Sequence, residues 1–420
     1  MTIPIADRRL QQRAWALYGW ANHAYVTAIL VTIFPLFLAR YWAHDLPGAV
    51  STQYLALANS AAGFIAMLMA PWLGALADRT GTRKRWLAIF TVLGVAATLM
   101  MSLAGQGNWP LALLALVLAS VGFFGGSSFQ DALIVQVADE HESDRVSASG
   151  YALGYLGGGL ALLVSVVLVL KPAWFGLGDA STATRISFVF VALWWTVFSL
   201  PVFRRVPEPP SALEAGGWAE LYQTLRLVVR NKPVMEFLVA YWLYIDAIGT
   251  LQQMAVDFGA KLGLPTDALI EALLMVQFVS FPAAVAYGWI AARIGTLRSI
   301  RIGLLVFTAV AVWAYWMRSA AQFFQMAFAV SLVQGGVQAM SRSHFARLVP
   351  PGKSGEYFGF YNMVGKFAAV IGPLAVALVV RITHDPRLSI PVLTLFFITG
   401  LLLLRGLGES SAPDAALARQ

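Results

Sequence analysis

The sequence predicts an all-α membrane protein with twelve transmembrane helices in two pseudo-symmetric six-helix bundles. Hydrophobic residues make up 59% of the chain and charged residues only 12%, about half of the roughly 25% typical of soluble proteins. Uncharged windows long enough to cross a bilayer recur from one end of the chain to the other. Short motifs of the first half also return in the second half.

The first half holds six predicted spans. A helix needs about 20 apolar residues to cross a hydrocarbon core of about 30 Å. Windows 14–39 and 46–77 supply one span each, whereas window 86–130 is too long for a single crossing. Its Asn108-Trp109-Pro110 sequence is a turn signal that divides it into two. The remaining spans of this half are 146–170 and 186–203.

The second half repeats this pattern of six spans, two of which contain a charged residue. The predicted spans are 233–258 (with Asp246), 267–292, 299–317, 320–345, 355–380 (with Lys366) and 389–405.

The segment 204–232 is the longest break between spans. It combines arginines and prolines with apolar residues at helical spacing, so it is either a short amphipathic helix on the cytoplasmic membrane face or a solvated linker. We therefore divide the chain into an N-terminal bundle (1–203), this linker (204–232) and a C-terminal bundle (233–420).

The basic residues predict the orientation. Most of the 29 Lys and Arg residues fall on segments that share one side with both termini, including the cluster Arg79-Arg83-Lys84-Arg85. Such a bias marks cytoplasmic loops. We therefore expect a multi-pass protein of the cell (inner) membrane with both termini cytoplasmic. The net charge of +8 then reflects topology and not nucleic-acid binding.

The two halves share short motifs. Residues 74–82 (GALADRTGT) and 288–296 (GWIAARIGT) match at both glycines, and Gly125-Gly126 and Tyr151 align with Gly335-Gly336 and Tyr361. Both separations are near half the chain length, which indicates a duplication. Six-span repeats are typical of secondary transporters, whose solute site lies between the halves near mid-bilayer.

Several other functions are disfavoured by missing motifs. The sequence has no cysteine, no HExxH pair, no Walker A loop and no nucleophile elbow. This excludes an ATP-driven pump and argues against an enzyme or a bound metal or cofactor. A non-transporting membrane sensor would need an attached soluble domain, and none is recognised. We expect a monomer whose partners are the lipid bilayer, a small solute and protons.

Longer motifs resemble a known family. GALADRTGTRKR looks like the signature loop of the major facilitator superfamily. YGWAN from Tyr18, RVSASGYALGYLGGG from Arg145, YWLYID from Tyr241 and the run GGVQAMSRSHFARLVPPGKSGEYFGFYNMVGKFAAVIGPL from Gly335 are similar to its vacuolar-effluxer-like branch. This resemblance implies a twelve-helix facilitator, with amino-acid efflux as the best-known activity, in fungal vacuoles.

The chain departs from this branch at several expected cavity positions. The family usually has Asp at Gly19, a small residue at His23, Asn at Asp131, Asn at Ile245 and an apolar residue at His344. These departures bear on the substrate and not on the fold.

Four charged residues inside spans are the first site candidates. Ionised groups at mid-bilayer are costly, so they pair or line a wet cavity. Asp246 and Lys366 lie deep, which suggests an ion pair between them or Lys366 acting alone on a substrate carboxylate. Asp131 and Arg342 lie late in matching spans, where they line an inner vestibule or pair with each other or with loops. A purely structural role is the alternative for each.

Polar and aromatic residues complete the candidate set. His23 could couple proton movement, although a lone membrane histidine is more often a hydrogen-bonded packing residue. The further candidates for cavity edges and walls, which are equally compatible with core packing, are Tyr18, Trp20, Asn22, Tyr244, Tyr361 and Asn362.

The loop after the second span suggests a conformational latch. Asp78 ends a helix and is placed to accept hydrogen bonds from a facing helix N-terminus, while Gly81 supplies the tight turn. Arg79, Arg83 and Lys84 would bind loop carboxylates or lipid phosphates. The second half has Ala292 in place of the acid, which predicts a weaker second latch.

The function expected from these observations is secondary active transport of an amino acid or related small metabolite, by efflux and with proton coupling. A multidrug or xenobiotic exporter of the same fold is the alternative, since it would suit a larger aromatic cavity with few fixed charges.

The glycines Gly150, Gly154 and Gly158 are spaced for close helix packing.

Overall fold

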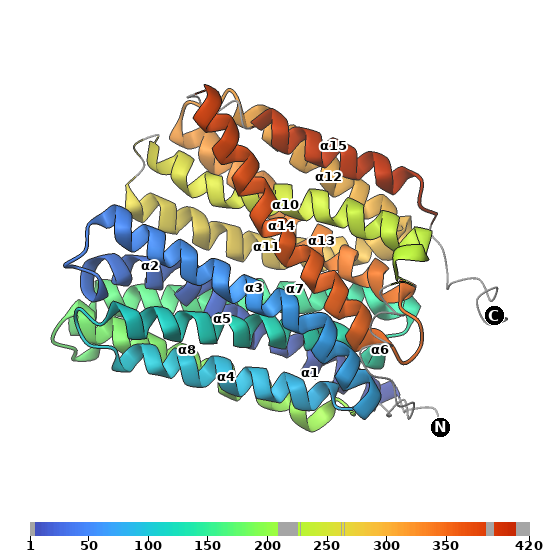
Figure 1. Ribbon diagram of the computed structural model, residues 1–420, viewed down its shortest axis with the longest axis horizontal. Coiled ribbons are helices and arrows are strands. Elements are labelled where there is room, and N and C mark those ends of the chain that lie inside the picture. Colours follow the sequence, from blue (N-terminus) through green and yellow to red (C-terminus); the bar gives the residue numbers. More distant parts are fainter. Residues whose placement is uncertain are drawn as a thin grey trace.

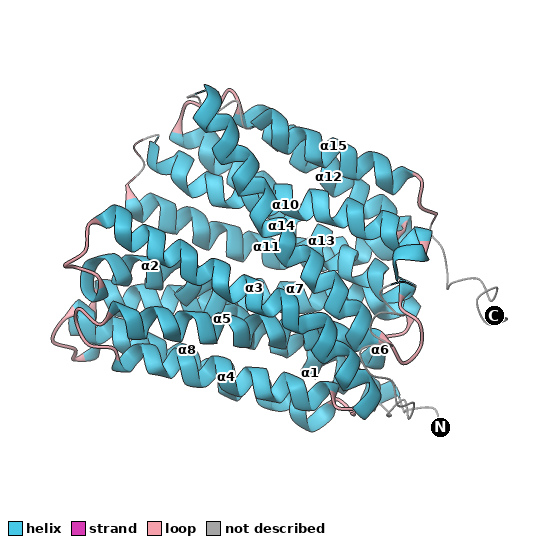
Figure 2. Cartoon of the chain, in the orientation of Figure 1, coloured by secondary structure: helices cyan, strands magenta, loops and turns pink. Residues whose placement is uncertain are grey.

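The computed structural model describes residues 5–208, 226, 228–261, 263, 265–383 and 390–408. Within these residues the chain is almost entirely helical and has no strand (Figure 2). Most of the predicted linker 204–232 lies outside the described residues, and so does its proposed amphipathic helix.

The first half supplies one helical rod for each of its six predicted spans. The first rod is composite, and the predicted turn at Asn108 is confirmed, since the Asn108 side chain accepts from the Leu111 N–H at 3.4 Å and so begins α5. The elements are α1 (Ile5–Ala24), η1 (Tyr25–Ile33), α2 (Phe34–Phe37), η2 (Leu38–Trp42), α3 (Gly48–Thr80), α4 (Arg83–Leu103), α5 (Trp109–Ala132), α6 (Ile134–Val137), α7 (Glu140–Leu170), η3 (Pro172–Phe175) and α8 (Ala180–Arg205).

The second half repeats this arrangement. Its elements are α10 (Lys232–Lys261), α11 (Thr266–Ile294), α12 (Thr296–Ala314), α13 (Ala320–Leu348), α14 (Ser354–Thr383) and α15 (Ile390–Arg405). Among the described residues, 10 helices are long and apolar enough to cross a membrane, and α15 is a shorter apolar helix. Each of the twelve predicted spans therefore corresponds to a helix, and the predicted all-α membrane fold is confirmed.

The first rod widens into a π-helix over Tyr25–Ile33, which the sequence pattern did not predict. Pro35 follows this segment; a proline lacks an N–H, and its ring collides with the carbonyl four residues earlier in a regular α-helix. A wider turn relieves that collision, and π-segments often occur at functional sites. The Thr32 hydroxyl donates to the Thr27 carbonyl at 2.9 Å and stabilises the wide turn.

The helices pack as two groups that run along a common direction (Figure 1). Helices α1–α8 form one group and α10–α15 the other. The groups meet where α7 packs on α11 and α13, and where α3 packs on α14. Large apolar side chains such as Leu57, Phe64 and Leu68 of α3 are exposed on the outside, as expected of a surface that faces lipid.

Candidate functional site

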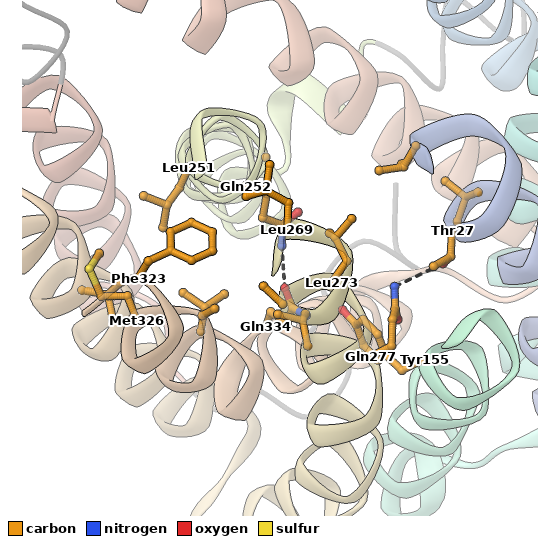
Figure 3. A pocket seen from close by; sticks show the side chains of 18 of the residues that line it. Thr27, Tyr155, Leu251, Gln252, Leu269, Leu273, Gln277, Phe323, Met326 and Gln334 are labelled. Atoms are coloured by element: carbon orange, nitrogen blue, oxygen red, sulfur yellow. Dashed lines mark hydrogen bonds between the residues drawn. The ribbon is translucent and has the colours of Figure 1, made fainter. Parts of the chain in front are cut away.

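A cavity of about 580 Å³ lies between the two groups of helices, within the size range typical of small-molecule sites. Its walls come from the first rod, α5, α7, α10, α11, α13, α15 and the end of α12 (Figure 3). The cavity lies toward one end of the bundle. Its lining includes residues near the starts of three helices, namely Leu269 of α11, Phe323 of α13 and Ile390 of α15.

The opposite end is the one at which α1 begins and α15 ends. We call it the basic end, because the α3–α4 connection there carries Arg79, Arg83 and Lys84. The cavity therefore lies toward the end remote from these arginines and lysine.

The cavity wall is mainly apolar. The described side chains that line it include no Asp, Glu, Lys or Arg. The polar side chains among them are His23, Thr27, Thr32, Tyr155, Gln252, Gln277, Gln334 and Gln338. Of all the residues predicted from sequence to form the site, only His23 lines the cavity.

Glutamines link the walls of the cavity. Gln277 of α11 donates to the Thr27 hydroxyl at 3.2 Å and so joins the two halves (Figure 3). The Gln252 side chain donates to Gln334 Oε1 at 2.7 Å, and Gln334 Nε2 donates to the Ser280 hydroxyl at 2.9 Å. These glutamines were not among the residues predicted from the sequence, although an amide inside an otherwise apolar span is a signal of a polar site.

His23 lies at the junction of α1 and η1. Its Nδ1 is 3.0 Å from both the Gly19 carbonyl and the Asn22 Oδ1. Its ring is packed among Phe123, Tyr151 and Tyr155, with centroids 6.3, 6.3 and 6.4 Å away. Asn22 itself faces Ser127 and does not line the cavity.

Asp246 and Lys366 do not form the predicted ion pair. One oxygen of the buried Asp246 carboxylate accepts from the Gly372 N–H at 2.9 Å and from the Thr250 hydroxyl at 3.5 Å. The other oxygen has no hydrogen-bond partner within the part of the chain that the structure describes. The Lys366 ammonium lies 3.4 Å from the centroid of the Phe124 ring, a cation–π contact. The expected pair is absent because these two side chains are engaged on different neighbours.

Asp131 and Arg342 form an ion pair of 2.8 Å between α5 and α13, and both side chains are buried. Arg342 also donates to the hydroxyl and carbonyl of Ser147 at 2.9 Å each. Its guanidinium lies over the rings of Trp15 and Tyr151, 4.7 and 4.5 Å from their centroids. Of the arrangements open from sequence, the structure has the mutual pair.

The Asp78 carboxylate binds the first turn of α14, as its position in the sequence suggested. It accepts from the backbone N–H groups of Gly355 and Glu356 at 2.8 and 2.9 Å and forms an ion pair with Arg83. Arg83 in turn donates to the Gly352 carbonyl at 2.8 Å. A negative charge at a helix N-terminus is stabilised by its free N–H groups.

The other residues of the predicted latch have different roles. Gly81 ends α3 with φ 64°, a conformation that favours glycine. The Lys84 ammonium donates to the Val206 carbonyl at 2.9 Å, and its backbone N–H to Glu208 at 3.0 Å. Arg79 is half-buried and interacts with other residues of the protein.

The second-half counterpart of this contact takes its carboxylate from a different helix. Ala292 cannot bind the opposite half, but Asp144 at the start of α7 supplies the carboxylate instead. It accepts from Thr296 at 2.9 Å and from Ser343 at 2.6 Å, and it pairs with Arg347 at 3.0 Å. The carboxylate therefore comes from Asp144 of the first half, and not from position 292 of the second half, at the interface between the halves.

A further ion pair lies at the surface of the basic end, within the first half. Arg8 pairs with Asp139 at 2.5 Å, and this hydrogen-bonded guanidinium holds the pKa of the Asp139 carboxyl below its usual range. The three inter-half connections, made by Asp78, Asp131 and Asp144, join the halves at the basic end, while the cavity lies toward the other end.

The aromatic candidates pack outside the cavity. Tyr18 bonds to Thr91 at 2.9 Å and Tyr244 to Ser341 at 2.6 Å. Trp20 stacks on Trp194 and Tyr361 on Tyr241, at centroid distances of 5.3 and 4.2 Å. Asn362 donates to Asp131 at 3.2 Å and thereby joins the buried ion-pair network.

Solved structures share this fold. The human organic anion transporter MFSD10 (TETRAN) superposes with a TM-score of 0.77 at 16% identity, covering 96% of this chain and 100% of that one. The proton:xylose symporter XylE superposes with a TM-score of 0.75 at 13% identity, covering 99% of each chain. The chain therefore has the fold of these two proteins, in which two groups of helices enclose a central cavity.

Sequence relatives identify the family within this class. The profile of the "Vacuole effluxer Atg22 like" family matches residues 46–142 and 130–415, and the chain belongs to this family. It is 34% identical to YxiO, an uncharacterised MFS-type transporter of Bacillus subtilis (strain 168), over 97% of this chain and 96% of that one. Autophagy-related protein 22 of Saccharomyces cerevisiae (strain S288c) is 23% identical over 97% of this chain and 92% of its own length.

Proposed function

We propose that the chain is a secondary active transporter that moves a small solute through the central cavity by alternating access. The observation that carries this proposal is the asymmetry of the bundle. Side chains of both halves meet around a cavity toward one end, whereas Asp78, Asp131 and Asp144 tie the halves together at the other. Separating these contacts while closing the cavity would expose the solute to the opposite side.

We further propose that the basic end is cytoplasmic, that the protein is a monomer of the cell membrane, and that transport is efflux. The positive-inside bias supports the orientation. Because the chain has no native cysteine, single cysteines at Gly178 and at Thr82 can test it directly. A membrane-impermeant maleimide added to intact cells should label the first position only, and labelling of Thr82→Cys alone would reverse the orientation.

Proton coupling is proposed to use Asp246. Its second carboxylate oxygen is buried and has no partner among the residues described, and a proton there would remove the cost of an ionised group in an apolar interior. Asp246 also lies one helical turn from Gly249, which lines the cavity. Protonation and solute binding would therefore act on the same turn of α10.

Two classes of solute are candidates for transport. Amino acids and related metabolites follow from the family resemblance. An uncharged amphipathic compound, such as a xenobiotic, is favoured by the described cavity lining, because that lining offers a zwitterion no opposite charge.

Uptake into proteoliposomes tests the function. The purified protein should accumulate at least one labelled member of a panel of amino acids and neutral amphipathic compounds when a pH gradient is imposed. Control vesicles lacking the protein should accumulate none. If no member shows either accumulation or counterflow, the transport proposal for this cavity is wrong.

A further inference from the structure

His23 lines the cavity, and one of its ring nitrogens is available as an acceptor. Its Nδ1 lies 3.0 Å from two oxygen acceptors, the Gly19 carbonyl and the Asn22 amide oxygen. The Asn22 amide is oriented by its Nδ2, which donates to Ser127 at 3.4 Å. The ring proton is therefore at Nδ1 and the lone pair at Nε2. Within the described residues Nε2 makes no hydrogen bond.

Gln277 presents a second acceptor on the facing wall. Its Nε2 donates to the Thr27 hydroxyl at 3.2 Å, and its Oε1 is buried without a hydrogen-bond partner among the described residues. Thr27 lies one turn after His23 on the same side of the first rod. Figure 3 shows Gln277 beside Tyr155 with its amide directed toward Thr27. A buried acceptor without a donor is costly, so these atoms fit a ligand that brings donors.

Three glycines of α7 make room for these side chains. A Cβ on Gly154 would lie 2.8 Å from His23 Nδ1, and one on Gly158 would lie 2.6 Å from the Thr27 hydroxyl oxygen. A Cβ on Gly159 would lie 2.9 Å from the Gln277 Cβ. The glycine series accommodates polar side chains of the cavity as well as the neighbouring helix backbone.

We propose that His23, Thr27 and Gln277 form a polar subsite for an uncharged solute that carries hydroxyl or amide N–H donors. Its apolar part would lie against Leu273, Val276 and Met326, which line the same cavity. The solute donates to His23 Nε2, and to Gln277 Oε1 once the Gln277 amide rotates toward the cavity. A zwitterion is disfavoured, because its ammonium and carboxylate would lose water without meeting an opposite charge. This proposal rests on the transport proposed above, in that the cavity is taken as the solute site.

Two probes with the same side chain separate the solute classes. N-acetyl-L-leucinamide is uncharged and has amide donors, whereas L-leucine is a zwitterion. Binding of each to the full chain in lipid nanodiscs is measured by thermal shift and by competition. We expect N-acetyl-L-leucinamide to bind and L-leucine to bind about tenfold more weakly or not at all. Tighter binding of leucine, or binding of neither probe, would overturn the proposal.

Variants of His23 test the subsite itself. His23→Leu and Gln277→Leu should each weaken N-acetyl-L-leucinamide binding by about tenfold. His23→Gln should retain most of the affinity, because a glutamine amide oxygen reaches the position of Nε2. The control is His141→Leu, an exposed histidine at the basic end. Unchanged affinity in both His23→Leu and Gln277→Leu would also overturn the proposal.

Two further measurements keep the outcomes distinct. Unliganded melting temperature and gel filtration establish that each variant is folded, and His23→Gln gives a result even if His23→Leu is not. The same variants are assayed for flux in proteoliposomes. Probe binding without any flux would contradict the transport proposal and leave the subsite intact, whereas flux with binding insensitive to both substitutions would contradict the subsite alone.

Discussion

Asp131 of α5 and Arg342 of α13 form a buried ion pair of 2.8 Å that joins the two halves at the basic end. Removing one partner of such a pair leaves an uncompensated charge, which typically costs about 3–5 kcal/mol. Removing both partners costs much less, because no charge is then left alone.

The first prediction is a double-mutant cycle on this pair. Arg342→Met should lower the melting temperature more than Asp131→Asn does, since Arg342 also holds Ser147 and lies between Trp15 and Tyr151. The double variant should recover part of the loss caused by Arg342→Met. Strictly additive melting temperatures would mean that the two residues are not coupled.

The second prediction concerns the contact between Asp78 and the first turn of α14. Asp78→Asn removes the charge from hydrogen bonds with two backbone N–H groups and with Arg83. Hydrogen bonds to charged groups contribute about 1.5–3 kcal/mol each, so the basic end should open about tenfold more often.

A reporter cysteine measures this opening. Ala339 is fully buried in α13 in the closed basic end, and the chain has no other cysteine to be labelled. Maleimide should therefore react about tenfold faster with Ala339→Cys when Asp78→Asn is present. The matched control is Asp267→Asn, an exposed acid at the opposite end of the bundle. Equal rates in all three proteins would show that Asp78 does not hold this end closed.

The third prediction concerns Gly154, whose missing side chain leaves space for the imidazole of His23. Gly154→Ala should cost about 1–3 kcal/mol through overpacking, because the added Cβ would lie 2.8 Å from His23 Nδ1. Adding His23→Ala should restore the melting temperature without restoring solute binding.

Gly63→Ala is the control for Gly154→Ala. Gly63 is helical and would have no neighbour within 4 Å of a Cβ, so alanine should raise stability by up to about 1 kcal/mol. If Gly154→Ala behaved in the same way, the space at His23 would not be a packing constraint.

The fourth prediction concerns Asp246. Asp246→Asn should abolish accumulation driven by a pH gradient and preserve counterflow, because the amide keeps the bond to Gly372 but cannot exchange a proton. Gly372→Ala should reduce accumulation as well, since its Cβ would lie 2.9 Å from the Asp246 Cγ and displace the carboxylate. If the Asp246→Asn variant accumulates solute at the normal level under a pH gradient, Asp246 has a structural role and does not couple protons.

The sequence alone determined the features that depend on local physics. Span positions follow from the transfer of about 20 consecutive residues into hydrocarbon, which is summed along one segment. Asn108 begins α5 and Gly81 ends α3 because capping and left-handed turns are set by the residues at the turn itself. The position of Asp78 at a helix end was enough to suggest that it binds a facing helix N-terminus.

Only the tertiary structure decided which side chains meet. Membrane helices are apolar on nearly all faces, so the linear pattern does not specify how each helix is rotated about its axis. Asp246 and Lys366 therefore looked like partners by depth, yet they contact Gly372 and Phe124. For the same reason Gln277 was overlooked, and the replacement of Ala292 by Asp144 across the interface was invisible in the repeat. Depth in the bilayer is a property of one segment, whereas contact is a property of two.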